Sequence, residues 1–202
     1  MTKSLFFVAT GFAAWIISSC NLKPDNPAIL NKRLFSIDSL IDGQTKILKQ
    51  LNVSVNREAG IDKEYDNVTF NPDTGFWKKE FSAFTATDIG KPALYDKYQI
   101  NHSDSSGFNL INYLGIDPAM NGIIKLSIAT DSSGGIVKIV IFQRENTFIY
   151  KSNRNMIMNF EHNSAFDENI IKSYHLEGYQ KILLRKQVSY DINVTLDWGK
   201  GS

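Results

Sequence analysis

The most regular pattern of apolar and polar positions lies near the C-terminal end of the chain. Apolar residues occupy every second position from Val188 to Trp198, and polar residues fill the positions between them. A period of two is typical of a strand with one face buried and one face in water. The sequence therefore predicts a β-strand over residues 188–198.

Residues 34–51 have the period of a helix instead. Their apolar positions recur at steps of three and four, and most of the charged residues fall on the other side: the apolar positions are Leu34, Ile37, Leu40, Ile41, Leu48 and Leu51. This spacing predicts an amphipathic helix. Gly43 lies inside it and costs about 1 kcal/mol relative to alanine.

A second helix is predicted after Asn71-Pro72-Asp73, where Asp73 is a candidate N-cap. Trp77, Phe81 and Phe84 follow at helical spacing, and Gly90-Lys91-Pro92 ends the element. The aromatic stripe could line a ligand site, but large aromatic residues more commonly fill a core, and we interpret it that way. The segment between the helices, residues 53–70, suits either a hairpin that turns at Ala59-Gly60 or a charged loop.

From about residue 94 the period changes from 3.6 to 2. Runs 123–130 and 136–143 are joined by Asp131–Gly135, which predicts a hairpin. Residues 136–142 are apolar on both faces except at Lys138, as expected of a central strand that is covered on both sides. Further strands are predicted over 95–101, 108–114, 146–151, 154–161 and 170–177. The predicted fold class is α+β: two helices from the N-terminal half pack on a curved, mostly antiparallel meander sheet of seven or eight strands.

Composition is consistent with one folded domain. Of 202 residues, 43% are hydrophobic and 12% aromatic, which is enough for a packed core. We expect a signal peptide over 1–19, a tether over 20–33, the domain over 34–198 and a tail over 199–202. Lys3 is the only charged residue in 1–20, so the rest has 21 basic and 21 acidic residues. A neutral chain has no global attraction for nucleic acid, and we predict none as a partner.

The first twenty residues have the features of a secretory signal. Lys3 is followed by an apolar stretch, Leu5–Ile17, which is short for a membrane span of roughly 20 residues. Ile17-Ser18-Ser19-Cys20 resembles the lipobox of bacterial lipoprotein precursors. The resemblance implies that Cys20 receives a diacylglycerol on its sulfur, that cleavage precedes it, and that an acyl chain such as palmitate is added to its nitrogen. The alternative is an ordinary signal, or an uncleaved anchor, with Cys20 incidental.

Two or three acyl chains give stable membrane anchoring, whereas one gives only marginal binding. Cys20 is the only cysteine, so no internal disulfide can form. Asn21 replaces the aspartate that retains many lipoproteins in the inner membrane. The resemblance therefore implies a lipid-anchored protein of the outer membrane that faces the periplasm.

The mature part is similar to a family of small uncharacterised lipoproteins from Bacteroidota. The likeness rests on Phe35-Ser36-Ile37-Asp38 and on a Trp-containing helix, Trp77 onward, that ends in Asp88-Ile89-Gly90-Lys91-Pro92. This resemblance implies the location and the fold of the protein, and it implies no activity because the family has none assigned.

The search for chemistry finds no GxSxG, HExxH, CxxC, P-loop or GxGxxG motif. Glu161-His162 with Asp167 and Glu168 is the densest group of potential metal ligands, but we interpret it as a solvated loop. His102-Ser103-Asp104 are neighbours in sequence, whereas triad members come from separate segments. Lys181, Arg185 and Lys186 form a basic patch that we interpret as a solvated edge. We predict no catalytic residue, metal or cofactor.

The resulting hypothesis is a non-catalytic envelope lipoprotein that binds a partner protein or a hydrophobic ligand. The alternative is an envelope hydrolase with a carboxylate site outside the known motifs. Two facing carboxylates or a His–acid pair in a concave site would favour the hydrolase. An apolar cavity would favour a lipid carrier, and a filled core would favour protein binding. The sequence leaves the oligomeric state open.

Overall fold

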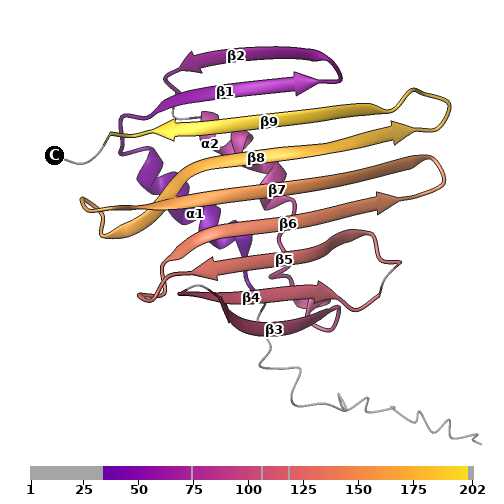
Figure 1. The fold of residues 1–202 in the computed structure, drawn as a ribbon, viewed down its shortest axis with the longest axis horizontal. Helices are drawn as coiled ribbons and strands as arrows, with labels where there is room; N and C mark the ends of the chain where they lie inside the picture. The colour runs from indigo at the N-terminus through magenta and orange to yellow at the C-terminus, as the bar shows by residue number, and fades with distance from the viewer. Residues whose placement is uncertain (1–33, 74, 106, 118, 200–202) are drawn as a thin grey trace, which may run out of the picture. The chain divides into compact units, whose positions relative to one another are not determined.

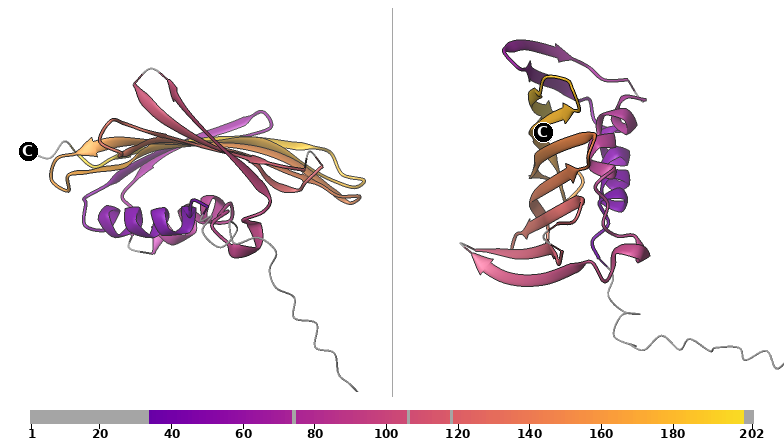
Figure 2. Two further views of the ribbon diagram at one scale, coloured as in Figure 1. Left: turned by 90° about the horizontal axis from the view of Figure 1, so that it is seen from below. Right: turned by 90° about the vertical axis from the view of Figure 1, so that its right-hand side faces the viewer.

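The computed structural model describes residues 34–73, 75–105, 107–117 and 119–199. Within them, nine antiparallel strands form one sheet, and short helices lie on one of its faces (Figures 1 and 2). The strands are β1 (Ser54–Ile61), β2 (Glu64–Phe70), β3 (Tyr98–Ser105), β4 (Phe108–Gly115), β5 (Gly122–Thr130), β6 (Ile136–Asn146), β7 (Tyr150–Asn163), β8 (Glu168–Ile182) and β9 (Val188–Asp197). The helices are α1 (Ile37–Leu48), α2 (Phe76–Glu80), α3 (Ser82–Thr85) and the 3-10 turn η2 (Pro92–Leu94).

The sheet joins the two ends of the described chain. Strands β3 to β9 form the predicted meander, and the β1–β2 hairpin then adds to β9, so the order is β2-β1-β9-β8-β7-β6-β5-β4-β3. The predicted strand over 188–198 is confirmed as β9, and the 123–143 hairpin is confirmed as β5 and β6. The expected count of seven or eight strands is too low, because the 53–70 hairpin joins the same sheet.

The sequence pattern misplaced one turn and one strand. The β1–β2 turn lies at Asp62-Lys63, and Gly60 lies in β1, where the ring of Tyr65 comes within 2.5 Å of the place that a Cβ would occupy. The predicted strand over 146–151 contains a turn at residues 147–149 instead, and one long strand, β7, follows it.

The helices are shorter than predicted. The structure confirms α1, whose first N–H groups are held from two sides: Ser36 Oγ accepts from Ser39 N–H at 3.2 Å, and Asp88 Oδ1 accepts from Ile37 N–H at 2.8 Å. The N-cap of α2 is Gly75 and not Asp73 as predicted, although Asp73 Oδ1 accepts from Phe76 N–H at 2.8 Å at the start of the helix. The second helix breaks at Phe81 into α2 and α3, because its aromatic residues have modest helix propensity and their packing sets the backbone.

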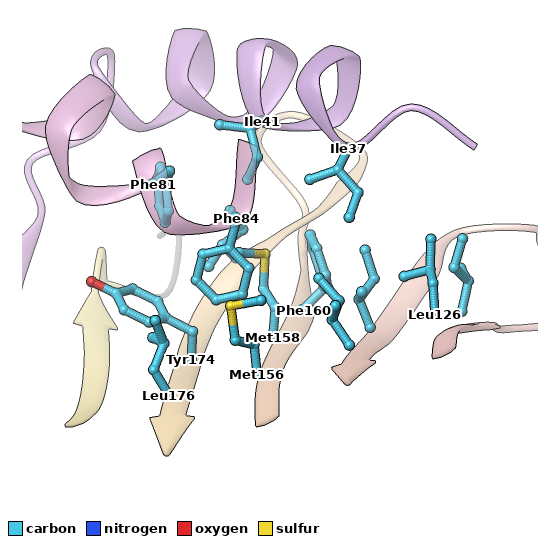
Figure 3. Packing of buried hydrophobic residues seen from close by; sticks show 14 of the residues in the cluster. Ile37, Ile41, Phe81, Phe84, Leu126, Met156, Met158, Phe160, Tyr174 and Leu176 are labelled. Carbon is cyan, nitrogen blue, oxygen red and sulfur yellow. The ribbon is translucent and has the colours of Figure 1, made fainter. Parts of the chain in front are cut away.

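The core lies between the helices and the sheet (Figure 3). Trp77 and Phe81 stack with ring centroids 5.8 Å apart, and Phe81 and Phe84 both meet Tyr174 of β8 edge-on. The predicted burial of the aromatic stripe is confirmed. The buried hydrophobic residues of the described chain form a single cluster, which is the core of this domain.

Candidate functional site

The second face of the sheet is covered by no described helix or strand (Figure 2). Side chains alternate along each strand, so buried Ile139 and Ile141 point to the helices while Val140 and Phe142 point the other way. The expectation that residues 136–142 are covered on both sides is therefore wrong. Their apolar second side belongs to an exposed surface, which we call the open face.

Three apolar side chains form a strip at the centre of the open face: Val140, Phe142 and Ile157. Val140 lies directly opposite Ile157, and Phe142 is the next residue on the same side of β6. All three are half-buried among polar neighbours. An apolar centre with a polar rim is the usual anatomy of a protein-binding surface.

A polar cluster flanks this strip on β8 and β9. His175 and Glu177 are two residues apart on β8, so they share a face, and Asp191 of β9 lies directly opposite Glu177. His175 Nε2 and Asp191 Oδ1 are 3.1 Å apart. Asn155 donates to Glu177 at 3.0 Å, and Asn193 donates to Asp191 at 2.9 Å. The strand register thus holds these side chains in fixed positions before any ligand binds.

A recess of about 400 Å³ adjoins the cluster. Tyr65 and Gly60 line one side of it, and Phe142 and Asn155 line the other. Because Gly60 has no side chain, the exposed Tyr65 ring can lie over β1 and extend the open face toward the sheet edge. The recess combines aromatic rings with amide and carboxylate groups, which suits a peptide or another polar chain.

The cluster has the donors of a metal site. One ligand atom from each of His175, Glu177 and Asp191 lies within 4.8 Å of the other two. A nitrogen and two carboxylates would suit zinc, which takes three or four such ligands. His175 is already hydrogen bonded to Asp191, and asparagine amides donate to Glu177 and Asp191, so each of the three groups has a partner within the protein. The absence of a metal stays a prediction.

Sequence reasoning missed this cluster. Asp191 lies 16 residues from His175 in the chain, and only the β8–β9 register brings the two together. The available signal was the alternation of residues 188–198, which places Asp191 on the wet side of its strand.

The two groups singled out from the sequence as a possible metal site and a possible triad form neither among the described residues. His162 Nε2 and Asp167 Oδ1 are 3.8 Å apart and both side chains are exposed, consistent with a solvated loop. His102 and Ser103 are adjacent in edge strand β3, so their side chains point to opposite faces and form no triad. Cys20, with the signal peptide and the tether, lies outside the described residues.

Comparisons add no relative: no family model, no curated protein and no solved structure matches the chain. Among the described residues, no helix is both long and apolar enough to cross a membrane.

Proposed function

We propose that this chain is a lipid-anchored, non-catalytic binding protein of the bacterial cell envelope, and that its open face binds a partner protein. One observation carries the proposal. Val140, Phe142 and Ile157 put apolar side chains on the uncovered face of a sheet whose core is complete without them. Partly exposed apolar residues inside a polar rim are explained if another protein covers them.

The packing on the helix side favours a protein partner over a hydrophobic ligand. Phe84, Met156 and Met158 occupy the space between α3 and the sheet, and Phe160 lies beside them (Figure 3). Side chains therefore fill the volume that a lipid carrier would leave for its cargo. Native mass spectrometry of the purified chain provides the check, because a bound lipid would favour the carrier.

The proposed location of the protein rests on residues 1–21. The lipobox-like Ile17-Ser18-Ser19-Cys20 supports anchoring through Cys20, and Asn21 supports the outer membrane, facing the periplasm. The resemblance to small Bacteroidota lipoproteins agrees with that location. We expect Cys20→Ser to leave the domain folded but to prevent processing and lipid anchoring. Metabolic labelling with a radioactive or alkyne fatty acid tests this directly, since labelling that persists in Cys20→Ser contradicts the proposal.

Site-directed photo-crosslinking tests the binding face. A photoreactive amino acid at Ile157 should crosslink one discrete envelope protein, whereas the same group at exposed Asp42 of α1 should not. A further substitution, Phe142→Asp, should weaken that crosslink at least ten-fold, because it places a charge in the apolar strip. Equal crosslinking from both positions, or no effect of Phe142→Asp, would contradict an interface on the open face.

The polar cluster supports a second candidate function, an envelope hydrolase. Glu177 and Asp191 face each other across β8 and β9, and His175 is hydrogen bonded to Asp191. Paired carboxylates with an adjacent histidine can perform general acid–base chemistry. A panel of chromogenic glycosides and esters tests it: hydrolysis that disappears in both Glu177→Gln and Asp191→Asn would favour an enzyme.

A further inference from the structure

Two loops meet at one end of the sheet. The β6–β7 turn and the β8–β9 loop lie side by side (Figure 1, right), and Leu183 N–H donates to Ile149 O at 2.8 Å. Together they present five large apolar residues, which we call the apolar tip: Phe148, Ile149, Ile182, Leu183 and Leu184. A recess of about 560 Å³ runs along the base of the tip, lined in part by Tyr150.

The apolar tip is unusually exposed. The side chains of Phe148 and Leu184 are 88% and 96% exposed, and the other three residues are also classed as exposed. Single apolar residues on a surface need no explanation, but a contiguous group on neighbouring loops marks an interaction site. The open face does not include this tip, so the tip needs an occupant of its own.

Leu184 adds a second observation. Its backbone has φ of 62°, in the left-handed region that glycine and asparagine tolerate and leucine rarely adopts. The turn is closed by Arg185 N–H donating to Ile182 O at 3.0 Å. A residue kept in an unfavourable conformation with its side chain in water indicates a role for that side chain outside the fold.

Within the two loops that form the tip, every charged residue is positive, and the nearest acidic residues are Asp62, which is hydrogen bonded to Ser189, and Glu145, which lies opposite Ser152. Lys151 and Lys181 lie directly opposite each other on β7 and β8, and Arg185 and Lys186 follow in the next loop. Residues 147–151 and 181–187 contain no acidic residue. Facing like charges are unfavourable in water, and an anionic surface would neutralise them.

From these observations we infer that the apolar tip docks on an anionic lipid bilayer. Phe148 and Leu184 would enter the interfacial region, and the four cations around them would meet the phosphate groups. Binding of this kind combines buried apolar area with attraction of lysine and arginine to anionic lipid. Residues 21–202 contain 21 basic and 21 acidic residues, so this attraction comes from the local arrangement alone. The inference does not rest on Cys20 and goes beyond the partner-binding function of the open face.

Vesicle binding tests the inference with the chain from Asn21 onward, which keeps the whole described core and lacks both lipid and signal. Its tryptophans, Trp77 and Trp198, are both buried, so Phe148→Trp adds one reporter at the tip. With vesicles of phosphatidylethanolamine and phosphatidylglycerol, emission should shift to the blue and brominated lipids should quench it. With phosphatidylcholine vesicles the binding should be much weaker, and added salt should weaken the anionic binding.

Variants separate the tip from folding. Leu184→Asn suits the left-handed backbone, so it should keep stability while weakening vesicle binding about ten-fold. Lys181→Glu should weaken it at least five-fold, the effect expected from losing one cation near the surface. Phe108→Ser, which removes an exposed aromatic at the opposite end of the sheet, should leave binding unchanged.

Several results would overturn the inference. The inference is overturned if the wild-type chain does not bind the anionic vesicles. It is also overturned if binding survives the combination of Leu184→Asn and Phe148→Ser. A photoreactive group at Phe148 that crosslinks a protein in intact envelopes, and no lipid, would replace the bilayer with a protein partner. None of these outcomes bears on the crosslink from Ile157, so this inference and the proposed function fail separately.

Discussion

The side-chain carbonyl oxygen of Gln44 accepts a hydrogen bond from the backbone N–H of Ile171, at 2.8 Å and across 127 residues of sequence. The amide of Gln44 also donates to Asn169 O at 3.0 Å. Pairing between β8 and β9 begins only at Ser173, so β8 runs past its neighbour here. Gln44, buried on α1, therefore supplies backbone partners that a further strand would otherwise provide.

Gln44→Ala should destabilise the domain by about 2–4 kcal/mol. The substitution leaves a backbone donor and a backbone acceptor without partners, and each costs about 1–3 kcal/mol when buried. Urea unfolding followed by circular dichroism measures the change. Exposed Gln50 offers a matched control, since Gln50→Ala should stay within about 0.5 kcal/mol of the parent.

Gly43→Ala should stabilise the domain by about 0.5–1 kcal/mol. Gly43 lies in α1, and an added Cβ would meet no atom within 4 Å. Gly178→Ala is the contrasting case, because its Cβ would lie 2.2 Å from Asn153 O in the adjacent strand. Thermal unfolding should show a higher Tm for the first variant and a lower Tm for the second. A lower Tm for Gly43→Ala would mean that α1 is not packed as described.

Asp131 should make the β5–β6 turn sensitive to acid. Hydrogen bonds from the Ser133 side chain, the Asn169 amide and the turn backbone lower the pKa of Asp131 from 3.8 to about 2. A lowered carboxyl pKa gives stability that is complete above the unfolded value and is lost as pH falls toward the folded one. Asp131→Asn should therefore be less stable than the parent at pH 6, and the difference should shrink between pH 4 and pH 2. A difference that stays constant over that range would contradict the assignment.

Arg57, Glu80 and Tyr174 should behave as one coupled unit. Glu80 of α2 pairs with Arg57 of β1 and accepts from the Tyr174 hydroxyl, and Arg57 also lies over the Phe70 and Phe76 rings. Burial, followed by the charge of Glu80, raises the pKa of Tyr174, so its hydroxyl stays protonated. Glu80→Ala should cost about 1–3 kcal/mol, because it leaves two polar groups without a partner.

A double-mutant cycle measures that coupling. Arg57→Met and Glu80→Leu should each destabilise the domain, and the double variant should be less destabilised than their sum by about 0.5–3 kcal/mol. Strict additivity of the two changes would show that α2 is held by aromatic packing alone.

The pattern of apolar and polar residues predicted an element correctly where one face of that helix or strand is buried and the other is exposed to water. The helix at α1 and the strand at β9 show clear periods, and both lie where predicted. It failed at residues 146–151, where Phe148 and Ile149 suggested a strand but lie exposed in a turn. Apolar residues there belong to a surface, and a periodic pattern cannot separate an apolar surface from a core.

The candidate site was beyond sequence reasoning for a different reason. Val140 and Phe142 looked like the second buried side of a central strand, yet nothing in the described chain covers them. His175 and Asp191 meet because of a register between two strands, and that register depends on the length of the loop joining them. The spacing of residues along the chain predicts neither the uncovered side of β6 nor the contact between His175 and Asp191.

The pairing of β1 with β9 also sets the order in which this protein can be completed. Residues 54–61 pair on one side with β2, close in sequence, but on the other side only with residues 190–197, so the hairpin joins the rest of the sheet only when nearly all of the described domain has been made. Closing so long a loop costs conformational entropy, and this cost is offset only when β9 forms its contacts with β1. The pairing of β1 with β9 is therefore expected to be among the last steps in forming the sheet.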